Sequence, residues 1–215
     1  MKQTITIIDI GCGNILSIQR AFEQFGTEVT VTSNYEEILS SHRLVLPGVG
    51  AFEKAMLSLE KINFINLIKD NKFKKIPLLG ICLGMQLLFE ESEEFGKFRG
   101  LGLIKGKVKK LPSLSLKNKK LKIPSIGWQK LTLRKKISSD KIKQFFKNFN
   151  TDDSFYFVHS YFVNPDEKNL TLASYDFGGH QIPSIVAKDN IIGCQFHPEK
   201  SGNFGLNLIK NFISL

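Results

Sequence analysis

The chain has 215 residues, of which 42% are hydrophobic and 23% charged, the balance of an ordinary globular protein that can bury a full core. Its three cysteines are widely spaced, with no CxxC or Cys/His metal spacing, so we expect neither a disulfide framework nor a metal or other cofactor. The net charge is +10, and few aromatic residues interleave with the first lysine run, at 105–122, which predicts solvated surfaces, with partner docking as the alternative, rather than nucleic-acid binding.

The first half of the chain alternates strand and helix signals. The pattern predicts buried strands at residues 5–9 and 76–80 and further strands at 28–32 and 43–46. Between and after them, helical patterns cover about 15–25, 52–70 and 84–91. Because nearly all-apolar strands alternate with helices, we expect an α/β fold with a mostly parallel sheet that is covered on both faces.

The second half of the chain is rich in β-strand signals. Short runs predict strands near 101–111, 121–133, 155–163, 170–175, 183–188 and 191–195, and a helix from about 205 to 213 closes the chain. The polar, lysine-rich stretch 134–150 fits either a helix or a mobile insertion. Neither an internal repeat nor a linker is evident, so we expect a single domain over 1–215.

The sequence also indicates where the protein works. It contains no apolar stretch long enough to span a bilayer, and no signal-peptide pattern precedes the first predicted strand. The odd number of cysteines is typical of a reducing compartment. We therefore expect a cytoplasmic protein without membrane contact.

A predicted strand-to-helix turn carries the strongest chemical signal, Gly80-Ile81-Cys82-Leu83-Gly84. This is the cysteine form of the nucleophile elbow, in which glycines permit a tight turn that projects the nucleophile at the carboxyl end of the sheet. The helix N-terminus favours a thiolate, and backbone N–H groups, especially that of Leu83, can hold an oxyanion. The alternative is a buried structural cysteine, because many unrelated α/β proteins carry similar turns.

A thiol nucleophile needs a base, and the base needs a group that orients it. His197 follows a predicted strand and precedes Pro198 and Glu199. The proline fixes the local backbone, so Glu199 can bond one imidazole nitrogen while the other faces the thiol. We therefore expect Cys82, His197 and Glu199 to form a catalytic triad, and His42 and His180 to be structural or surface residues.

Two motifs together resemble the class I (triad) glutamine amidotransferases: residues 80–86, Gly-Ile-Cys-Leu-Gly-Met-Gln, and residues 195–199, Gln-Phe-His-Pro-Glu. The resemblance covers the whole chain and implies the fold of that family, a flavodoxin-like, mostly parallel sheet with flanking helices and a β-rich second half. It also implies a glutaminase activity. Further segments are similar to the glutaminase subunit of imidazole glycerol phosphate synthase, of histidine biosynthesis: residues 9–14, 47–52, 126–128 and 158–161.

The resemblance implies roles for residues around the nucleophile. Cys82 would attack the side-chain carbonyl of glutamine, and the oxyanion would be held by Leu83 and by a loop that must first rearrange, which contains Gly48, Val49 and Gly50. The implied substrate-binding residues are Gln86, Glu94, His159, Ser160 and Tyr161. Glu94 would hold the glutamine ammonium group, although a solvated charge at a helix end is the simpler alternative for this residue.

The resemblance also implies a partner, because free ammonia would be lost to water. A cyclase or other synthase subunit would dock over the site as a heterodimer, with Asn14, Trp128 and Tyr156 near the interface; core packing is the alternative for Trp128. Ser125 and Gln129 depart from the Pro-His-Ile-Gly-Trp-Asn pattern that we expect in the partner-facing segment. A paralogous subunit, which supplies ammonia to a nucleotide-sugar or surface-glycan precursor synthase, therefore stays open as an alternative.

Other classes fit less well. A non-catalytic amidotransferase-like regulator would typically have lost Cys82 or His197, and both are present. The stress-protein and cysteine-peptidase branch has a similar elbow, but would not be expected to show the motif at 195–199.

Overall fold

A large mixed sheet forms the centre of the molecule in the computed structural model, which describes residues 4–11, 13–134, 137, 139–150 and 152–215. Across this sheet the strands are β2 (Glu28–Thr32), β1 (Thr4–Ile8), β3 (Arg43–Leu46), β4 (Leu78–Ile81), β14 (Ile191–Cys194), β13 (His180–Lys188), β12 (Thr171–Phe177) and β9 (Thr132–Leu133). Neighbours pair in parallel from β2 to β14 and antiparallel from β14 to β9. The carboxyl ends of the parallel strands therefore share one edge.

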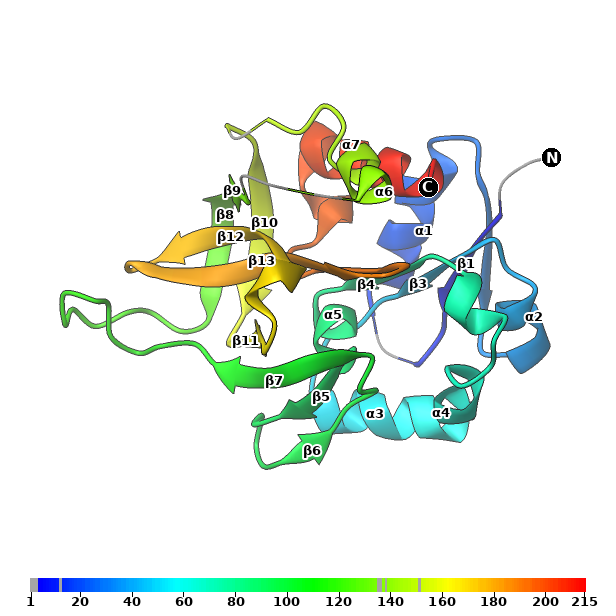
Figure 1. The fold of residues 1–215 in the computed structure, drawn as a ribbon, viewed down its shortest axis with the longest axis horizontal. Coiled ribbons are helices and arrows are strands. Elements are labelled where there is room, and N and C mark those ends of the chain that lie inside the picture. The colour runs from blue at the N-terminus through cyan, green and yellow to red at the C-terminus, as the bar shows by residue number, and fades with distance from the viewer. Residues whose placement is uncertain (1–3, 12, 135–136, 138, 151) are drawn as a thin grey trace.

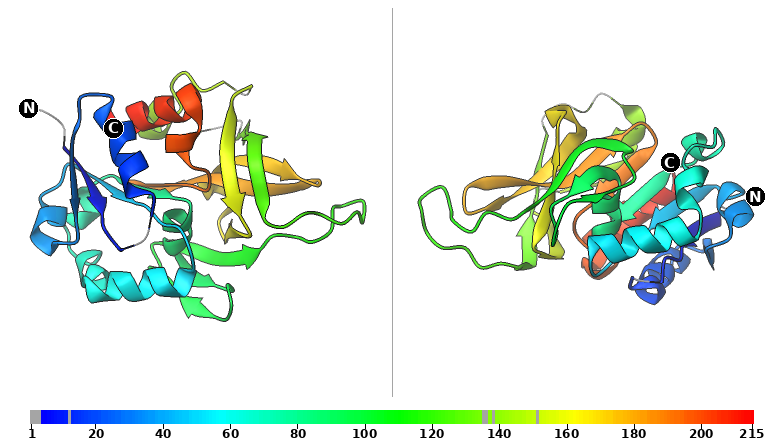
Figure 2. Two further views of the ribbon diagram at one scale, coloured as in Figure 1. Left: turned by 180° about the vertical axis from the view of Figure 1, so that it is seen from behind. Right: turned by 90° about the horizontal axis from the view of Figure 1, so that it is seen from below.

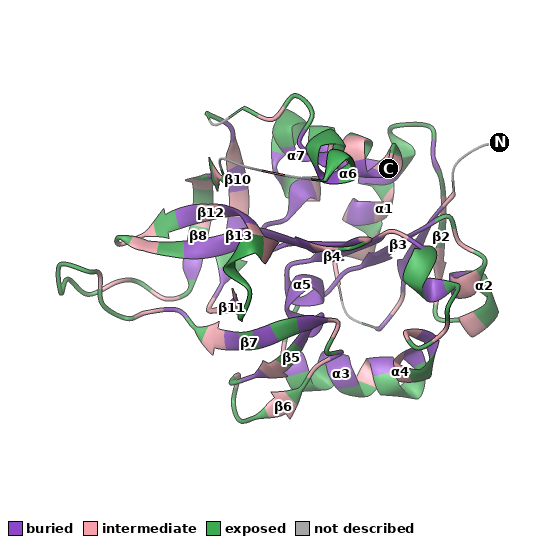
Figure 3. Cartoon of the chain, viewed as in Figure 1, coloured by how far each residue is buried: buried purple, intermediate pink, exposed green. Residues whose placement is uncertain are grey.

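Helices cover both faces of the sheet (Figure 1). One face is covered by α1 (Ile15–Glu23), α6 (Asp140–Phe145) and α7 (Gly202–Ile213). The other is covered by α2 (Tyr35–Leu39), α3 (Phe52–Lys61), α4 (Phe64–Leu67) and α5 (Leu83–Leu87). Fully buried phenylalanines anchor each layer, such as Phe22 in α1 and Phe52 in α3. Burial of each such side chain contributes about 1.5–3 kcal/mol, which is why the apolar faces of these helices point inward (Figure 3).

Two smaller sheets extend the fold beside the carboxyl edge (Figure 2). One contains β11 (Tyr161–Pro165), β7 (Ile104–Lys110), β5 (Phe89–Ser92) and β6 (Phe98–Arg99) in that order, and the other pairs β8 (Ser125–Lys130) with β10 (Ser154–His159). Between β7 and β8 a long arm reaches outward and is held at the β12–β13 turn, where the Leu116 N–H donates to the Gly178 carbonyl. Short 3-10 helices lie at Phe73–Lys75, Lys168–Leu170 and Pro198–Lys200.

The expected parallel sheet with helices on both faces is confirmed, two expected helices are corrected, and a helix is found in the stretch for which a helix or an insertion was left open. The helix expected over 52–70 breaks at Asn63, which takes a left-handed conformation with φ of 59° between α3 and α4. The helix expected over 84–91 ends at Leu87, and β5 begins two residues later. In the stretch 134–150, α6 forms at Asp140–Phe145, while residues 135, 136 and 138 lie outside the described ones.

In the described part of the chain, no helix is long and apolar enough to cross a membrane. His42 and His180 lie at the surface, as expected. His42 bonds the Thr4 hydroxyl, and His180 bonds the Leu114 carbonyl of the arm.

Candidate active site

Cys82 lies between β4 and α5, at the carboxyl edge of the sheet. Its backbone has φ of 54° and ψ of −112°, a conformation that is strained for a residue with a side chain. The strain is held in place because the Cys82 N–H donates to the Cys194 carbonyl at 2.8 Å and the Cys82 carbonyl accepts from Met85 and Gln86 at the start of α5. The expected nucleophile elbow is present in the structure.

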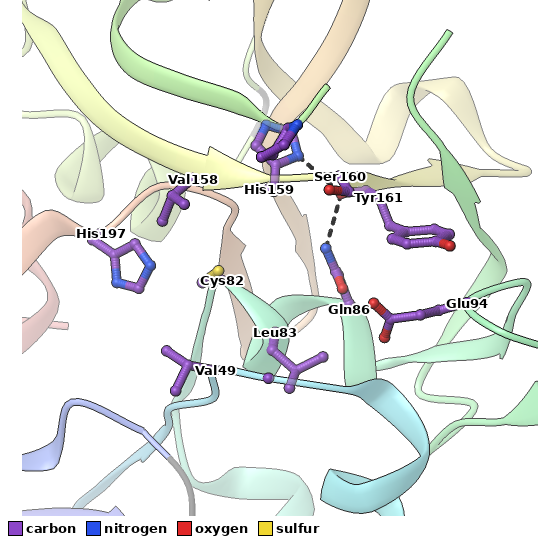
Figure 4. A pocket seen from close by; sticks show the side chains of 12 residues that line it. Val49, Cys82, Leu83, Gln86, Glu94, Val158, His159, Ser160, Tyr161 and His197 are labelled. Atoms are coloured by element: carbon purple, nitrogen blue, oxygen red, sulfur yellow. Dashed lines mark hydrogen bonds between the residues drawn. The ribbon is translucent and has the colours of Figure 1, made fainter. Parts of the chain in front are cut away.

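His197 and Glu199 lie beside this elbow on the segment that follows β14. Nδ1 of His197 is 2.8 Å from Oε1 of Glu199, and both side chains are almost fully buried. The backbone is fixed from two sides: the His197 N–H donates to the Tyr156 carbonyl, and the Ser201 hydroxyl donates to the His197 carbonyl at 2.6 Å. The imidazole is therefore held rigidly, with its second nitrogen free to face Cys82 (Figure 4).

The charges around His197 favour its protonated form. Burial lowers the pKa of His197, but hydrogen bonding and charge from Cys82 and Glu199 outweigh burial and raise that pKa from 6.5 to about 10. At neutral pH the imidazole therefore carries a proton that it can donate. A protonated imidazole next to sulfur also stabilises a thiolate, the nucleophilic form of cysteine.

A cavity of about 330 Å³ opens over Cys82, a volume suited to a small-molecule substrate. Its walls include Val49, Gly50, Cys82, Leu83, Gln86, Glu94, Pro124, Val158, His159, Ser160, Tyr161 and His197. In Figure 4 these side chains come from both halves of the chain, with His197 and Val49 near Cys82 on one side and Gln86, Glu94 and Tyr161 on the other. Among the described residues, no cluster of histidine, cysteine, aspartate and glutamate is arranged to hold a metal ion.

Glu94 is tied to the start of α3 at one side of this cavity. Its Oε2 accepts the Phe52 N–H at 2.7 Å, so the carboxylate also caps an otherwise unpaired backbone donor. In Figure 4 the carboxylate points into the cavity beside Gln86. The alternative of a merely solvated charge is wrong for this residue, because the side chain has a fixed partner at the cavity wall.

Gln195 is a residue whose part in the site the sequence motif did not reveal. It is fully buried, its Oε1 accepts from Nε2 of Gln86 at 3.0 Å, and its Nε2 lies 3.8 Å from the Cys82 sulfur. Nε2 of Gln86 also donates to the Tyr161 carbonyl at 3.0 Å. The two glutamines therefore link the nucleophile to β11, and sequence spacing gave no sign of this link because the residues are 109 positions apart.

His159 lines the cavity but is engaged on both ring nitrogens. Nδ1 lies 2.8 Å from the Tyr161 carbonyl and Nε2 lies 2.9 Å from the Tyr175 hydroxyl. Burial lowers the pKa of His159 to about 4, so the ring is neutral. Neither nitrogen is available to a substrate, and the expected substrate contact is therefore replaced by a role within the protein.

Trp128 and Tyr156 lie side by side on the outer face of the β8–β10 ribbon. Their ring centroids are 6.0 Å apart, and Trp128 is 56% exposed, which excludes core packing as its role. Ile126 and Val158 pair next to them on the same face, and Val158 also lines the cavity. An apolar patch of these four residues therefore adjoins the mouth of the cavity. Asn14 lies at the N-terminus of α1, beyond the carboxyl end of β1.

The comparison with known families decides what this site is. The model described as glutamine amidotransferase class-I matches residues 6–215 of the chain. The chain belongs to the class I glutamine amidotransferases. This amidotransferase is 44% identical to imidazole glycerol phosphate synthase subunit HisH 1 from Legionella pneumophila (strain Lens), over 99% of each chain. It is 46% identical to subunit HisH from Caldanaerobacter subterraneus subsp. tengcongensis, over 97% of this chain and 96% of that relative.

Solved structures show the same fold at lower identity. PurLQS from Thermotoga maritima matches this amidotransferase with a TM-score of 0.71 and 18% identity, covering 100% of this chain and 98% of that one. A crystal structure of a glutamine amidotransferase matches with a TM-score of 0.70 and 15% identity, covering 98% and 99%. The resemblance to this enzyme family, inferred from two short motifs, is confirmed.

Gly84→Ala tests how the elbow of this amidotransferase is built. A Cβ at Gly84 would lie 1.8 Å from the Leu46 carbonyl oxygen, so the backbone of α5 must move away from β3. We expect a loss of about 3 kcal/mol in the free energy of unfolding, measured by urea denaturation, together with loss of activity. Gly11→Ala is the control: its Cβ would meet nothing within 4 Å, and its positive φ alone predicts a loss of only about 1 kcal/mol. Equal losses would contradict the steric explanation.

Proposed function

We propose that this amidotransferase is the glutaminase subunit of imidazole glycerol phosphate synthase, which hydrolyses glutamine to glutamate and ammonia for a cyclase partner in histidine biosynthesis. The proposal rests on one observation above all: relatives with that name align with nearly the whole chain at 41–46% identity. The geometry of the site supports it, because the residues at 82, 197 and 199 form a buried Cys–His–Glu arrangement at a small cavity. We take residues 1–215 as one glutaminase domain that works in the cytoplasm.

The proposed reaction begins with attack of the Cys82 sulfur on the side-chain carbonyl carbon of glutamine, which forms a C–S bond. His197 donates its proton to the amide nitrogen as the C–N bond breaks, which gives ammonia and a thioester. Neutral His197, still oriented by Glu199, then accepts a proton from water while the water oxygen attacks the thioester. The C–S bond breaks, and glutamate leaves with the thiolate regenerated.

Backbone and side-chain groups of the cavity are assigned to the substrate as part of this proposal. The Leu83 N–H, at the start of α5, holds the oxyanion together with the loop of Gly48, Val49 and Gly50. Val49 is 41% exposed at the mouth of the cavity, where a docked partner can reach it. Glu94 and Gln86 receive the ammonium group of glutamine, and Ser160 and Tyr161 line the same wall.

The apolar patch on the β8–β10 ribbon is the proposed docking face for the cyclase subunit. Exposed aromatic and aliphatic side chains of this kind are typical of the centre of protein–protein interfaces. The patch adjoins the cavity through Val158, so a partner seated on it would receive ammonia without release to solvent. Asn14 is assigned to the edge of the same interface.

Stimulation by a loaded cyclase tests this function. We expect glutamate release by the purified chain to be slow alone and to rise at least tenfold when a histidine-pathway cyclase subunit and its nucleotide ligand are added, because docking completes the oxyanion site. Glutamate is measured by a coupled dehydrogenase assay. If no stimulation occurs while Cys82 still reacts with a glutamine-like alkylator, the glutaminase chemistry stands and the partner is the synthase of a sugar-modifying paralogue, the alternative raised by Ser125 and Gln129.

A pair of variants locates the partner in the same assay. Trp128→Ala should weaken cyclase binding at least tenfold, which is the effect expected of an interface aromatic. Phe25→Ala also removes an exposed aromatic ring, but from the loop between α1 and β2, and should leave binding unchanged. Equal effects of the two variants would contradict docking on the β8–β10 ribbon.

A further inference from the structure

A chain of hydrogen bonds runs from the core to the cavity behind the substrate-facing side chains. It starts at the Tyr175 hydroxyl on β12, which lies 2.9 Å from Nε2 of His159 on β10. Nδ1 of His159 lies 2.8 Å from the Tyr161 carbonyl, which also accepts from Nε2 of Gln86 at 3.0 Å. Every group in this chain is buried or half-buried, so each donor must find its acceptor inside the protein.

The direction of each bond follows from the chemistry of its atoms. The Tyr161 carbonyl only accepts, so Nδ1 of His159 must carry the proton. In a neutral ring Nε2 is then an acceptor, and the Tyr175 O–H must donate to it. Burial raises the pKa of Tyr175 to about 12, and burial lowers that of His159 to about 4, so both groups keep these protonation states at neutral pH.

Gln86 is oriented by the same chain. Its NH₂ group faces two acceptors, the Tyr161 carbonyl and Oε1 of Gln195, and both of its protons are used. Its Oε1 is therefore the atom left to face the cavity, where the Glu94 carboxylate also points (Figure 4). Two acceptor groups on one wall suit the ammonium group of an amino acid.

We propose that Tyr175 is a positioning residue for glutamine: by donating to His159 it fixes the ring tautomer that holds the Tyr161 carbonyl, and thereby the orientation of Gln86. Without the Tyr175 hydroxyl, the proton of His159 is free to move to Nε2. Nδ1 would then face the Tyr161 carbonyl as a second acceptor and repel it. The inference rests on the proposed function, because Gln86 is assigned there to the substrate.

Ser125 contacts the same chain of hydrogen bonds, at Tyr175. It is the buried residue opposite His159 in the β8–β10 ribbon, and its side chain interacts with the Tyr175 hydroxyl. Ser125, where the family pattern led us to expect a histidine, therefore faces the interior of the protein beside Tyr175 and not a partner. The ring of Tyr175 itself is held by Phe157, with centroids 4.7 Å apart.

Tyr175→Phe tests the proposal, since it removes the hydroxyl and keeps the ring. The probe is diazo-oxo-norleucine, an electrophilic glutamine analogue that alkylates Cys82, used on the full chain at a series of concentrations. We expect the half-saturating concentration to rise about fivefold, the effect of one lost buried hydrogen bond, with little change in the limiting rate. Alkylation by iodoacetamide, which needs no glutamine site, should be unchanged. Tyr35→Phe, in α2 and far from the cavity, is the matched control.

Two further measurements separate positioning from general damage. Nitrogen NMR of protein labelled at its histidines reports whether Nε2 of His159 is an unprotonated nitrogen that accepts a hydrogen bond. We expect this signal to change in Tyr175→Phe and to stay unchanged in Tyr35→Phe. The double variant with Gln86→Ala and Tyr175→Phe should have the same half-saturating concentration as Gln86→Ala alone. A further fivefold rise in the double variant would overturn the link through Gln86. The proposal would also be overturned if Tyr175→Phe left the half-saturating concentration unchanged. The same holds if Tyr175→Phe slowed the alkylation of Cys82 equally with both reagents. If alkylation of Cys82 in the unsubstituted chain does not saturate with rising concentration of the glutamine analogue, the proposed function fails. This result is distinct from a failure of the Tyr175 proposal.

Discussion

Cys82→Ala abolishes glutamine hydrolysis. Cys194, the other cysteine that the structure describes, cannot replace the sulfur: it is buried behind the elbow, its sulfur is directed to the Gly80 carbonyl, and burial raises its pKa. We expect the rate of glutamate release in the activated complex to fall on the order of 10⁴-fold or more. Residual hydrolysis above the background of a mock preparation would refute the nucleophile assignment.

The same variant should keep its place in the synthase. The alanine removes only a sulfur atom at the floor of the cavity, so gel filtration with the cyclase subunit should show an unchanged complex. Ammonium salts at raised pH, where more free ammonia is present, should restore product formation by that complex. A failure of ammonia to restore it would contradict ammonia transfer between the subunits.

Glu199→Gln lowers activity and moves its pH dependence. The carboxylate that fixes Nδ1 of His197 at 2.8 Å becomes a neutral amide of the same shape. We expect kcat/KM for glutamine to fall roughly 100-fold, the scale of a general acid–base contribution. Glu199 is one of two groups that raise the pKa of His197 to about 10, so without its charge the imidazole loses its proton at lower pH. The alkaline limb of the pH–rate profile should therefore shift downward.

Glu167→Gln is the control for Glu199→Gln. This exposed carboxylate precedes the 3-10 helix at Lys168–Leu170, far from the cavity, and its neutralisation changes the net charge by the same amount. We expect both the rate and the pH profile of this variant to match those of the unsubstituted chain. An alkaline limb that stays fixed in Glu199→Gln would mean that another group sets it.

The helices and strands could be predicted from the sequence where the local residue pattern and the tertiary contacts favour the same structure. The strands expected at 28–32 and 43–46 match β2 and β3 to the residue: β3 is buried throughout, and the edge strand β2 has valines at alternate positions between polar residues. Prediction failed where tertiary contacts override local propensity. The pattern of 84–91 is helical, yet Phe89–Ser92 pairs with β7 as a strand, and Asn63 breaks a helix that its neighbours would continue.

For the site, motifs predicted the residues to which we assign the reaction and missed those that hold them. Cys82, His197 and Glu199 are recognisable because their chemistry demands those residue types in those local contexts. Gln195 and Tyr175 are not, because glutamine and tyrosine occur in many roles and only the fold places them at the nucleophile and at His159. The apparent anomaly at Ser125 became interpretable only with its neighbour Tyr175 in view.

The place of β4 in the large sheet also bears on the order in which the site is assembled. β4 pairs with β3 on one side and with β14, from the end of the chain, on the other. Contacts between β4 and β14 join residues as much as 114 positions apart. Such distant pairings close large loops and form late in folding. His197, which follows β14, therefore reaches Cys82 only after this distant pairing has formed, so the proposed site is among the last parts of the fold to be completed.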